Sequence, residues 1–367
     1  MARAEALIGI DLFCGAGGVT RGFRDAGIDV RVGIDVEEKF RETYEKNNPG
    51  SKFLGGRLES MSAHDILKMV KPKRGEKIVL AACAPCQPFS NQNKRGLVHG
   101  FADTRGTLLF EALRVVRELK NIGWPPDFLF LENVPGMNKG AAWHDTKTFL
   151  FDNSYALAFE TINAADYGVP QNRRRFIAIA RRGWEFIDMP EITHGPGRLP
   201  CVTVGEALAG IPAVKAGEMS RALDNHRARS LSALNLKRIV AVPKNGGSRS
   251  AFTDDLVLDC HKDFKGHKDV YGRMSADRPA PTITTRCVSI TNGRFGHPYE
   301  DRGITVREAA RLQTFPDNYV FYSDSLGLEA KMVGNAVPVL LAEVFGRHLA
   351  KILSADKRDQ RQAVGVR

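Results

Sequence analysis

Short apolar runs alternate with helical patterns over the first half of the chain, and this alternation constrains the fold more than any other feature. Each run is nearly continuous in apolar side chains, as in strands that are buried on both faces. Six such runs occur: ALIGIDLF (6–13), VRVGIDV (30–36), KIVLAAC (77–83), DFLFLENV (127–134), YALAFETI (155–162) and RFIAIA (175–180). Strands and helices that alternate at this spacing predict a doubly wound, mostly parallel α/β sheet.

The longest helical pattern between two of these runs is DTRGTLLFEALRVVRELKN, with Asp103 or Thr104 as its N-cap. Its apolar positions share one helical stripe. They are Leu108, Leu109, Ala112, Leu113, Val116 and Leu119. The stripe predicts a helix that covers the sheet.

The alternation stops after about residue 185. Segments such as MPEITHGPGRLP and VPKNGGSRSAFTDD are rich in proline, glycine and polar residues. We therefore expect residues 186–296 to form a smaller, irregular domain. Helical patterns return at 304–315 and 336–353, and the last residues, 356–367, have the composition of a disordered tail.

Composition narrows the class of protein. The net charge of +11 over 367 residues favours a polyanionic partner such as nucleic acid, although an ordinary basic enzyme would also fit. Six cysteines without the spacing of a small disulfide scaffold indicate free thiols and a reducing compartment. The chain has no secretory signal and no apolar run of about 18 residues, so we expect a soluble, cytoplasmic protein that does not enter a membrane.

A glycine-rich turn, DLFCGAGGVTRGF (11–23), joins the first predicted strand to the first predicted helix. Gly15, Gly17 and Gly18 allow a ligand to approach the backbone closely. The spacing matches neither the dinucleotide fingerprint nor the P-loop, which disfavours a phosphate cradle. Asp35 ends the next strand, where a partner for ribose hydroxyls belongs. A nucleoside cofactor without a pyrophosphate fits best, and S-adenosylmethionine is the obvious one.

Two further strands end in chemically active residues. The loop after residues 77–83 carries Cys86, and DFLFLENV ends with Glu132. Ligands of open parallel sheets bind beyond the carboxyl ends of the strands, so a thiol and a carboxyl group are expected in one cleft. In QNRRRF, Arg173 and Arg175 alternate onto one face together with Gln171, while Arg174 points the other way. Such arginines could lower the pKa of the thiol and bind a substrate oxygen.

Seven short motifs occur in order between residues 11 and 338: DLFCGAGG, PCQPFS, LENV, QNRRRF, RPAPTIT, TVREAARLQTFPD and VGNAVP. Together they resemble the ordered motif set of the cytosine-C5 DNA methyltransferases. The resemblance implies an S-adenosylmethionine methyltransferase fold in which residues 1–185 and 297–355 form the catalytic and cofactor-binding domain. Residues 186–296 would be the target-recognition domain.

The resemblance also implies a mechanism. Cys86 would attack C6 of a cytosine that has been flipped out of the duplex, so that C5 can accept a methyl group from S-adenosylmethionine. Glu132 would hold N3 and the exocyclic amine, and Arg173 and Arg175 would contact O2 and the backbone around it. Gln87, Ser90 and Thr282 are the expected DNA contacts.

On the cofactor side, the matching positions come from three of these motifs, from the end of the second predicted strand and from the long helical pattern. They are Phe13, Cys14, Gly15, Gly17, Gly18, Asp35, Val36, Pro85, Leu108, Asn335, Ala336 and Val337. The chain departs from the family pattern in three places. Asp35 replaces the usual glutamate, and Val36 stands where an aromatic residue often follows. The adenine-contacting segment is either GGRLES (55–60) or Asp65 with Ile66.

Other interpretations of the same residues fit less well. Cys83 and Cys86 form a C-x-x-C, and CHKDFKGH (260–267) contains possible ligands, but neither has a second ligand pair, so no metal site is expected. A tRNA-methylating branch shares the catalytic set but carries a Cys-Phe-Thr signature that is absent here. A binding module without activity would not need Cys86 and Glu132, and a nicotinamide oxidoreductase explains neither loop. The expected partners are double-stranded DNA and a cognate restriction endonuclease, and the expected state is a monomer.

Overall fold

The computed structural model describes residues 6–85, 107–183, 186–259 and 269–364. The chain divides into two compact units, which are described separately. The sheet unit comprises Met1–Ile162, Arg174–Ile192 and Leu341–Arg367, and the irregular unit comprises Asn163–Arg173 and Thr193–Leu340. These limits differ from the predicted domain limits, because the chain passes between the units at residues 162, 173, 192 and 340. The functions assigned to the two predicted domains stay a prediction.

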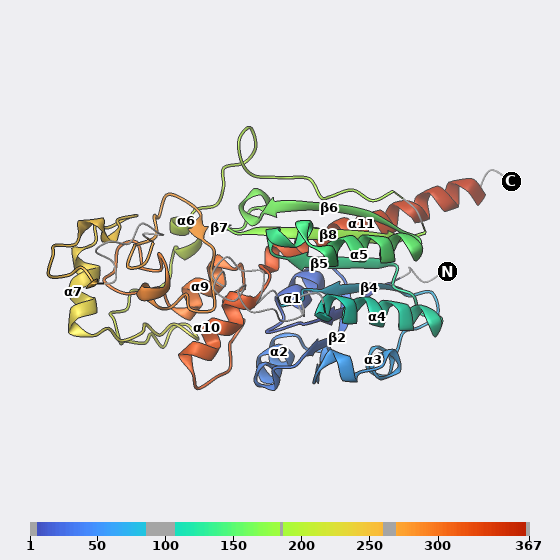
Figure 1. Ribbon diagram of the computed structural model, residues 1–367, viewed down its shortest axis with the longest axis horizontal. Coiled ribbons are helices and arrows are strands. Elements are labelled where there is room, and N and C mark those ends of the chain that lie inside the picture. Colours follow the sequence, from blue (N-terminus) through green and yellow to red (C-terminus); the bar gives the residue numbers. More distant parts are fainter. Residues whose placement is uncertain (1–5, 86–106, 184–185, 260–268, 365–367) are drawn as a thin grey trace. The chain divides into compact units, whose positions relative to one another are not determined.

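The described part of the sheet unit contains a seven-stranded sheet of order β3-β2-β1-β4-β5-β8-β6 (Figure 1). Neighbouring strands from β3 to β5 are parallel, and β8 is antiparallel to β5. The strands are β1 (Leu7–Leu12), β2 (Asp29–Asp35), β3 (Lys52–Gly55), β4 (Lys77–Ala82), β5 (Phe128–Asn133), β6 (Tyr155–Asn163) and β8 (Arg174–Arg182). The predicted doubly wound, mostly parallel α/β sheet is confirmed, and so are the six predicted strands. Strand β3 is an addition, since its four residues make too short a pattern to detect.

Helices cover both faces of this sheet (Figure 1). They are α1 (Gly18–Asp25), α2 (Arg41–Asn47), α3 (Ala63–Val70), α4 (Thr107–Asn121), α5 (Ala141–Asp152) and α11 (Val339–Val364), with short 3-10 turns at Glu38–Phe40, Leu58–Ser60 and Pro135–Lys139. Alternate strand residues such as Ile8, Ile10 and Leu12 join the core cluster that includes α3, α4 and α5. On the other face, the ring of Phe130 packs between Phe23 of α1 and Phe345 of α11.

The stripe predicted for α4 is confirmed. Leu109, Leu113 and Val116 are buried, and Leu108 is half-buried in the first turn of the helix. The proposed caps, Asp103 and Thr104, lie outside the described residues. The stripe faces the core because its side chains recur every three or four residues along one side of the helix.

One glycine on the opposite face of the sheet permits a close approach. A Cβ atom on Gly33 of β2 would lie 2.4 Å from the ring of Tyr44 in α2. The absence of a side chain at position 33 therefore lets the buried Tyr44 ring pack directly against β2. Its hydroxyl group then reaches Thr20 of α1, at an O–O distance of 2.9 Å.

Helix α11 continues to Val364. The expectation of a disordered tail from residue 356 is therefore wrong for residues 356–364. The segment contains no glycine or proline, and alanine, lysine, arginine and glutamine all have high helix propensity. Within the described ranges, no helix is both long enough and apolar enough to cross a bilayer.

The irregular unit consists of short elements joined by long loops. Its helices are α6 (Val204–Leu208), α7 (Ala233–Ala241), α9 (Val306–Leu312) and α10 (Leu326–Asn335), with 3-10 turns at Ala164–Tyr167, Arg249–Ala251 and Ile290–Asn292. Two-residue strands, β7 (Gln171–Asn172) and β9 (Ala280–Pro281), pair in parallel. Fully buried arginines hold these loops together by donating hydrogen bonds to their backbone carbonyl groups. Arg273, for example, donates to the carbonyl groups of Val242, Ile239 and His297.

Candidate active site

The glycine-rich turn between β1 and α1 has a backbone that few side chains can adopt. Phe13, Gly15 and Gly17 have φ values of 63°, 54° and 91°. For Phe13 this left-handed conformation is strained, and it persists because the surrounding structure holds it. The Cys14 N–H donates to the Ile34 carbonyl at 3.0 Å, which fastens the turn to β2. The predicted cofactor turn is thus hydrogen-bonded to the neighbouring strand.

Asp35 at the end of β2 holds the centre of this turn. Its Oδ2 accepts a hydrogen bond from the Gly15 N–H at 2.9 Å, and its Oδ1 accepts one from the Glu37 N–H at 2.8 Å. A Cβ atom on Gly15 would meet nothing within 4 Å, so the space in front of it is open. Val36 beside it is exposed. The Asp35 carboxylate therefore borders an open stretch of backbone.

Cys14 lies in the same turn, but it is unsuited to nucleophilic chemistry. Burial raises the pKa of its thiol well above the usual range, and the nearby Asp11 and Asp35 raise it further. A thiol that stays protonated is neither a good nucleophile nor a good metal ligand. Cys14 therefore contributes packing next to the turn.

A buried ion pair lies at the carboxyl end of β5. Nε of Arg175 lies 2.8 Å from Oε1 of Glu132, and only about 8% of the Glu132 side chain is exposed. This oxygen nevertheless has no aligned hydrogen-bond donor within the described structure. The carboxyl group is thus held in place by a charge while one oxygen atom keeps its capacity to bind a donor. Phe176 and Trp143 form an apolar wall of the small cavity beside it.

The loop expected to carry the nucleophile leaves the sheet next to this pair. Ala82, the last residue of β4, is paired with Leu131 of β5, which directly precedes Glu132. Nδ2 of Asn133 donates to the Ala84 carbonyl at 3.3 Å and so joins the two strand ends. Pro85 is exposed. Cys86, Gln87 and Ser90 lie outside the described residues.

The remaining predicted residues belong to the irregular unit. Alternation along QNRRRF is confirmed, since Gln171 and Arg173 are buried while Arg174 is exposed. Nη1 of Arg173 donates to the carbonyl of Ile283 at 3.0 Å. The Thr282 hydroxyl donates to the Asn172 carbonyl at 2.8 Å. Part of the Arg173 guanidinium and the Thr282 hydroxyl are therefore hydrogen-bonded to the backbone of the unit.

The third motif-matched cofactor segment, Asn335 to Val337, also belongs to the irregular unit. Asn335, the last residue of α10, is exposed, whereas Ala336 and Val337 are buried. A Cβ atom on Gly334, which precedes them, would lie 2.2 Å from the backbone of Thr284. This close contact fixes the position from which Asn335 projects.

Two buried glutamines have a positioning role that the sequence analysis did not identify. Nε2 of Gln171 donates to Oε1 of Gln313 at 2.8 Å, and Oε1 of Gln171 accepts from the Ile283 N–H at 2.8 Å. Gln313 in turn donates to the carbonyls of Val333 and Ala336. The pair thus connects four of the seven motifs. Neither motif carries a local sequence signal that relates the two glutamines.

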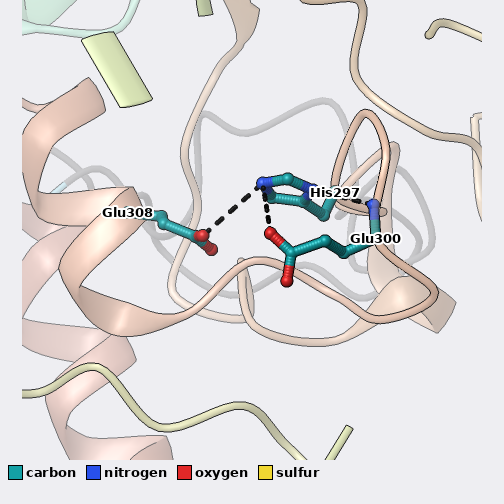
Figure 2. Close-up of side chains that lie close together, drawn as sticks. All are labelled: His297, Glu300 and Glu308. Carbon is teal, nitrogen blue, oxygen red and sulfur yellow. Dashed lines mark hydrogen bonds and ion pairs between the residues drawn. The ribbon is translucent and has the colours of Figure 1, made fainter. Parts of the chain in front are cut away.

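A group of potential metal ligands lies elsewhere in the irregular unit. Figure 2 shows His297, Glu300 and Glu308, whose ligand atoms lie within 4.8 Å of one another. Both oxygens of Glu308 are bound by the guanidinium of Arg302, each at 2.8 Å, and Nε of Arg302 lies 3.1 Å from Glu300. A divalent cation would have to share these carboxylates with a buried guanidinium, so the residues do not fit a metal.

Comparison with known proteins agrees with this geometry. A sequence model described as C-5 cytosine-specific DNA methylase matches residues 7–351. Type II methylase M.HgiDII of Herpetosiphon aurantiacus is 35% identical over 96% of this chain and 97% of its own length. Type II methyltransferase M1.HphI of Haemophilus parahaemolyticus is 33% identical over 94% and 86%.

Solved structures share the fold. A putative DNA modification methyltransferase from an E. coli prophage superposes with a TM-score of 0.67 at 24% identity, covering 95% of this chain and 100% of that chain. S. pombe Dnmt2 methyltransferase superposes with a TM-score of 0.65 at 16% identity, covering 95% and 99%. The match of the family over nearly the whole length means that this chain belongs to the C-5 cytosine-specific DNA methylases and is a DNA (cytosine-5-)-methyltransferase.

Proposed function

We propose that this chain transfers a methyl group from S-adenosylmethionine to C5 of a cytosine flipped out of duplex DNA, with Cys86 as the nucleophile. The observation that carries the proposal is the buried Glu132–Arg175 pair, where a carboxyl oxygen lacks an aligned donor beside the strand end that leads to Cys86. A pyrimidine with an exocyclic amine supplies such a donor.

The first loop fits a nucleoside cofactor. Gly15 leaves open space, Asp35 offers a carboxylate at its side, and Oδ1 of Asp11 behind the turn is buried without a hydrogen-bond partner. S-adenosylmethionine, when bound, supplies an electrophilic methyl group on a positively charged sulfur. The residues proposed to hold it are Phe13, Cys14, Gly15, Gly17, Gly18, Asp35, Val36, Pro85, Leu108, Asn335, Ala336 and Val337.

The chemistry follows from the weak nucleophilicity of C5. Addition of the Cys86 thiolate to C6 makes C5 electron-rich, and loss of the C5 proton after methylation lets the thiolate leave. Glu132 accepts from the exocyclic amine, and it donates to N3 when it carries a proton, which stabilises the charge that develops on the ring. Arg175, already beside Glu132, is placed to contact O2.

We assign Arg173 a different role from Arg175. Its guanidinium donates to backbone carbonyls of the irregular unit, so it positions the segments that contain Ile283 and Gly334. Lysine cannot reproduce a planar fork of donors. We expect Arg175→Lys to lower turnover about 100-fold while leaving the thermal unfolding temperature unchanged, by analogy with the loss of one donor in other active sites. Arg173→Lys should mainly lower the unfolding temperature. A loss of turnover without loss of stability in Arg173→Lys, together with a loss of stability in Arg175→Lys, would contradict the assignment.

On the DNA side, the charge of +11 supports binding to phosphates, with Gln87, Ser90 and Thr282 as proposed contacts. The names of the two relatives are those of type II enzymes. We therefore propose a restriction-modification role, with a cognate endonuclease that reads the same site and a methyltransferase that acts as a monomer.

The test is tritiated methyl transfer from S-adenosylmethionine to unmethylated duplex DNA, followed by bisulfite sequencing, with tRNA as the alternative substrate. Methylcytosine in one short sequence context supports the proposal, and incorporation into tRNA alone contradicts it. Cys86→Ser should abolish transfer but keep DNA binding. Cys83→Ser, three residues earlier on a half-buried strand end, is the matched control and should remain active. Equal activity of the two variants would disprove the role of Cys86.

A further inference from the structure

Asp11 is a buried carboxyl group without a partner of opposite charge among its hydrogen-bonded neighbours. It lies near the end of β1 and is 1% exposed. Its Oδ2 accepts hydrogen bonds from the Thr20 N–H at 3.1 Å and from the Thr20 hydroxyl at 2.7 Å. Its Oδ1 has no hydrogen-bond partner in the described structure. Burying a carboxylate costs free energy unless the charge is paired and hydrogen-bonded.

The position of Asp11 relates it directly to the cofactor turn. Asp11 precedes the turn on β1, and Thr20 follows it on α1, so their hydrogen bonds close the turn at its base. Asp35 binds the centre of the turn through Gly15. The turn proposed to hold the cofactor therefore has a carboxyl group at its base and a second one at its centre.

The groups that face Asp11 from the neighbouring elements leave its charge without compensation. Its strand neighbours are Gly33 on β2 and Ala81 on β4, which carry no charge. Burial raises the pKa of Asp11 to about 7, hydrogen bonds from Thr20 oppose the rise, and Asp35 adds to it. The Cys14 thiol stays protonated because burial also raises its pKa. The Tyr44 hydroxyl lies 2.9 Å from the Thr20 hydroxyl that binds Asp11.

We propose that Asp11 gives the cofactor turn a pH-dependent preference for the positively charged S-adenosylmethionine over its neutral-sulfur product, S-adenosylhomocysteine. The inference rests on the proposed cofactor site. A positive charge that binds near a half-protonated carboxyl group favours its ionised form, so binding releases a proton from Asp11 to solvent. By linkage, removing that proton strengthens the binding of the cationic ligand to the same extent. The product lacks the sulfonium charge, so ionisation of Asp11 strengthens its binding less.

The experiment is calorimetric titration of the purified full chain with each of the two ligands between pH 6 and pH 8. We expect the ratio of the two dissociation constants to change about fivefold in favour of S-adenosylmethionine over this pH range, which corresponds to a shift of one pKa unit on binding. Titration in buffers of different ionisation enthalpy counts the released protons directly. Asp11→Asn has nearly the same shape but no charge. Titration of the ligands themselves affects both proteins equally. Apart from that shared effect, the ratio of the two dissociation constants should not depend on pH in the variant.

A second variant keeps the test decisive if Asp11→Asn does not fold. Thr20→Val removes the hydroxyl donor that opposes the rise in pKa. It should move the midpoint of the pH dependence to higher pH. Identical pH profiles in the wild-type chain and the folded variants would overturn the inference about Asp11, even though both ligands bind. If neither ligand binds at any pH, the proposed cofactor site itself is wrong, and the inference falls with it.

Discussion

Removing Arg302 should destabilise the irregular unit far more than removing an exposed arginine. Arg302 is 0% exposed and Glu308 is 1% exposed, and two N–O contacts of 2.8 Å join them. Burial alone would raise the pKa of Glu308, but the hydrogen bonds and the charge of Arg302 outweigh it and hold that pKa below its ordinary value. Arg302→Met leaves this carboxylate buried without its guanidinium partner, with Nε2 of His297 still 3.6 Å away. Breaking such a buried pair typically costs about 3–5 kcal/mol.

The size of the effect can be read from thermal unfolding followed by circular dichroism. For a unit of this size, each kcal/mol lowers the unfolding temperature by about 2–4 °C, so we expect a decrease of about 10 °C. Adding Glu308→Gln removes the stranded charge and keeps an acceptor for the Thr305 N–H, so the double variant should recover part of the loss. Arg347→Met, which breaks an exposed pair with Glu343, is the control and should lose about 1 kcal/mol or less. A double variant no more stable than Arg302→Met would refute the reasoning.

Three other predictions concern the stability of buried positions within each unit. Asp11 has an ordinary pKa of 3.8 that rises to about 7 on folding, so the free energy of unfolding should fall by about 4 kcal/mol as the pH rises from 4 to 7. In urea titrations Asp11→Asn should lack that slope, and an unchanged slope would contradict the assignment. Gly334→Ala would place a Cβ atom 2.2 Å from the Thr284 backbone and should destabilise by at least 1–3 kcal/mol, roughly the cost of overpacking. Gly327→Ala in the same helix meets only an ordinary contact, the Ser325 hydroxyl at 3.6 Å, and should stabilise slightly. Equal unfolding temperatures for these two variants would exclude the clash. Trp143→Ala should cost about 3–5 kcal/mol of thermal stability, because the ring is 2% exposed and stacks edge-to-face on Phe176 with centroids 4.7 Å apart. A loss below 1 kcal/mol would mean that the cavity beside Glu132 collapses.

The strands of the sheet were predictable where the chain is apolar without interruption. β1, β4 and β5 are buried on both faces, so their composition alone identifies them. β3 was missed because only Phe53 of its four residues is buried. The direction of β8 could not be predicted either. An apolar run looks the same whether it lies parallel or antiparallel to its neighbour, and β8 follows an excursion through the irregular unit.

The candidate site was predictable as a set of strand ends and not as a set of contacts. Parallel strands place their carboxyl ends at one edge of the sheet, so the sequence predicts that Glu132 lies near the start of the Cys86 loop. In the structure the two strand ends are indeed neighbours. The contact of Asp35 with the Gly15 N–H has no sequence signal, because it depends on the φ values of the turn. The same holds for the glutamine pair. Gln171 and Gln313 are 142 positions apart, and no local pattern relates them.

QNRRRF shows where the period-two rule stops being informative. The rule correctly predicts that Arg173 is buried while Arg174 is exposed, because side chains alternate along extended backbone. It treats Arg173 and Arg175 as equivalent, however, and the structure does not. The regular strand is interrupted between Asn172 and Arg174, and Arg173 belongs to the irregular unit while Arg175 belongs to the sheet unit. A guanidinium committed to backbone carbonyls has few donors left for a substrate, whereas one paired with a carboxyl group at a strand end still has several. The motif therefore combines one arginine that builds the scaffold with one that is available for chemistry.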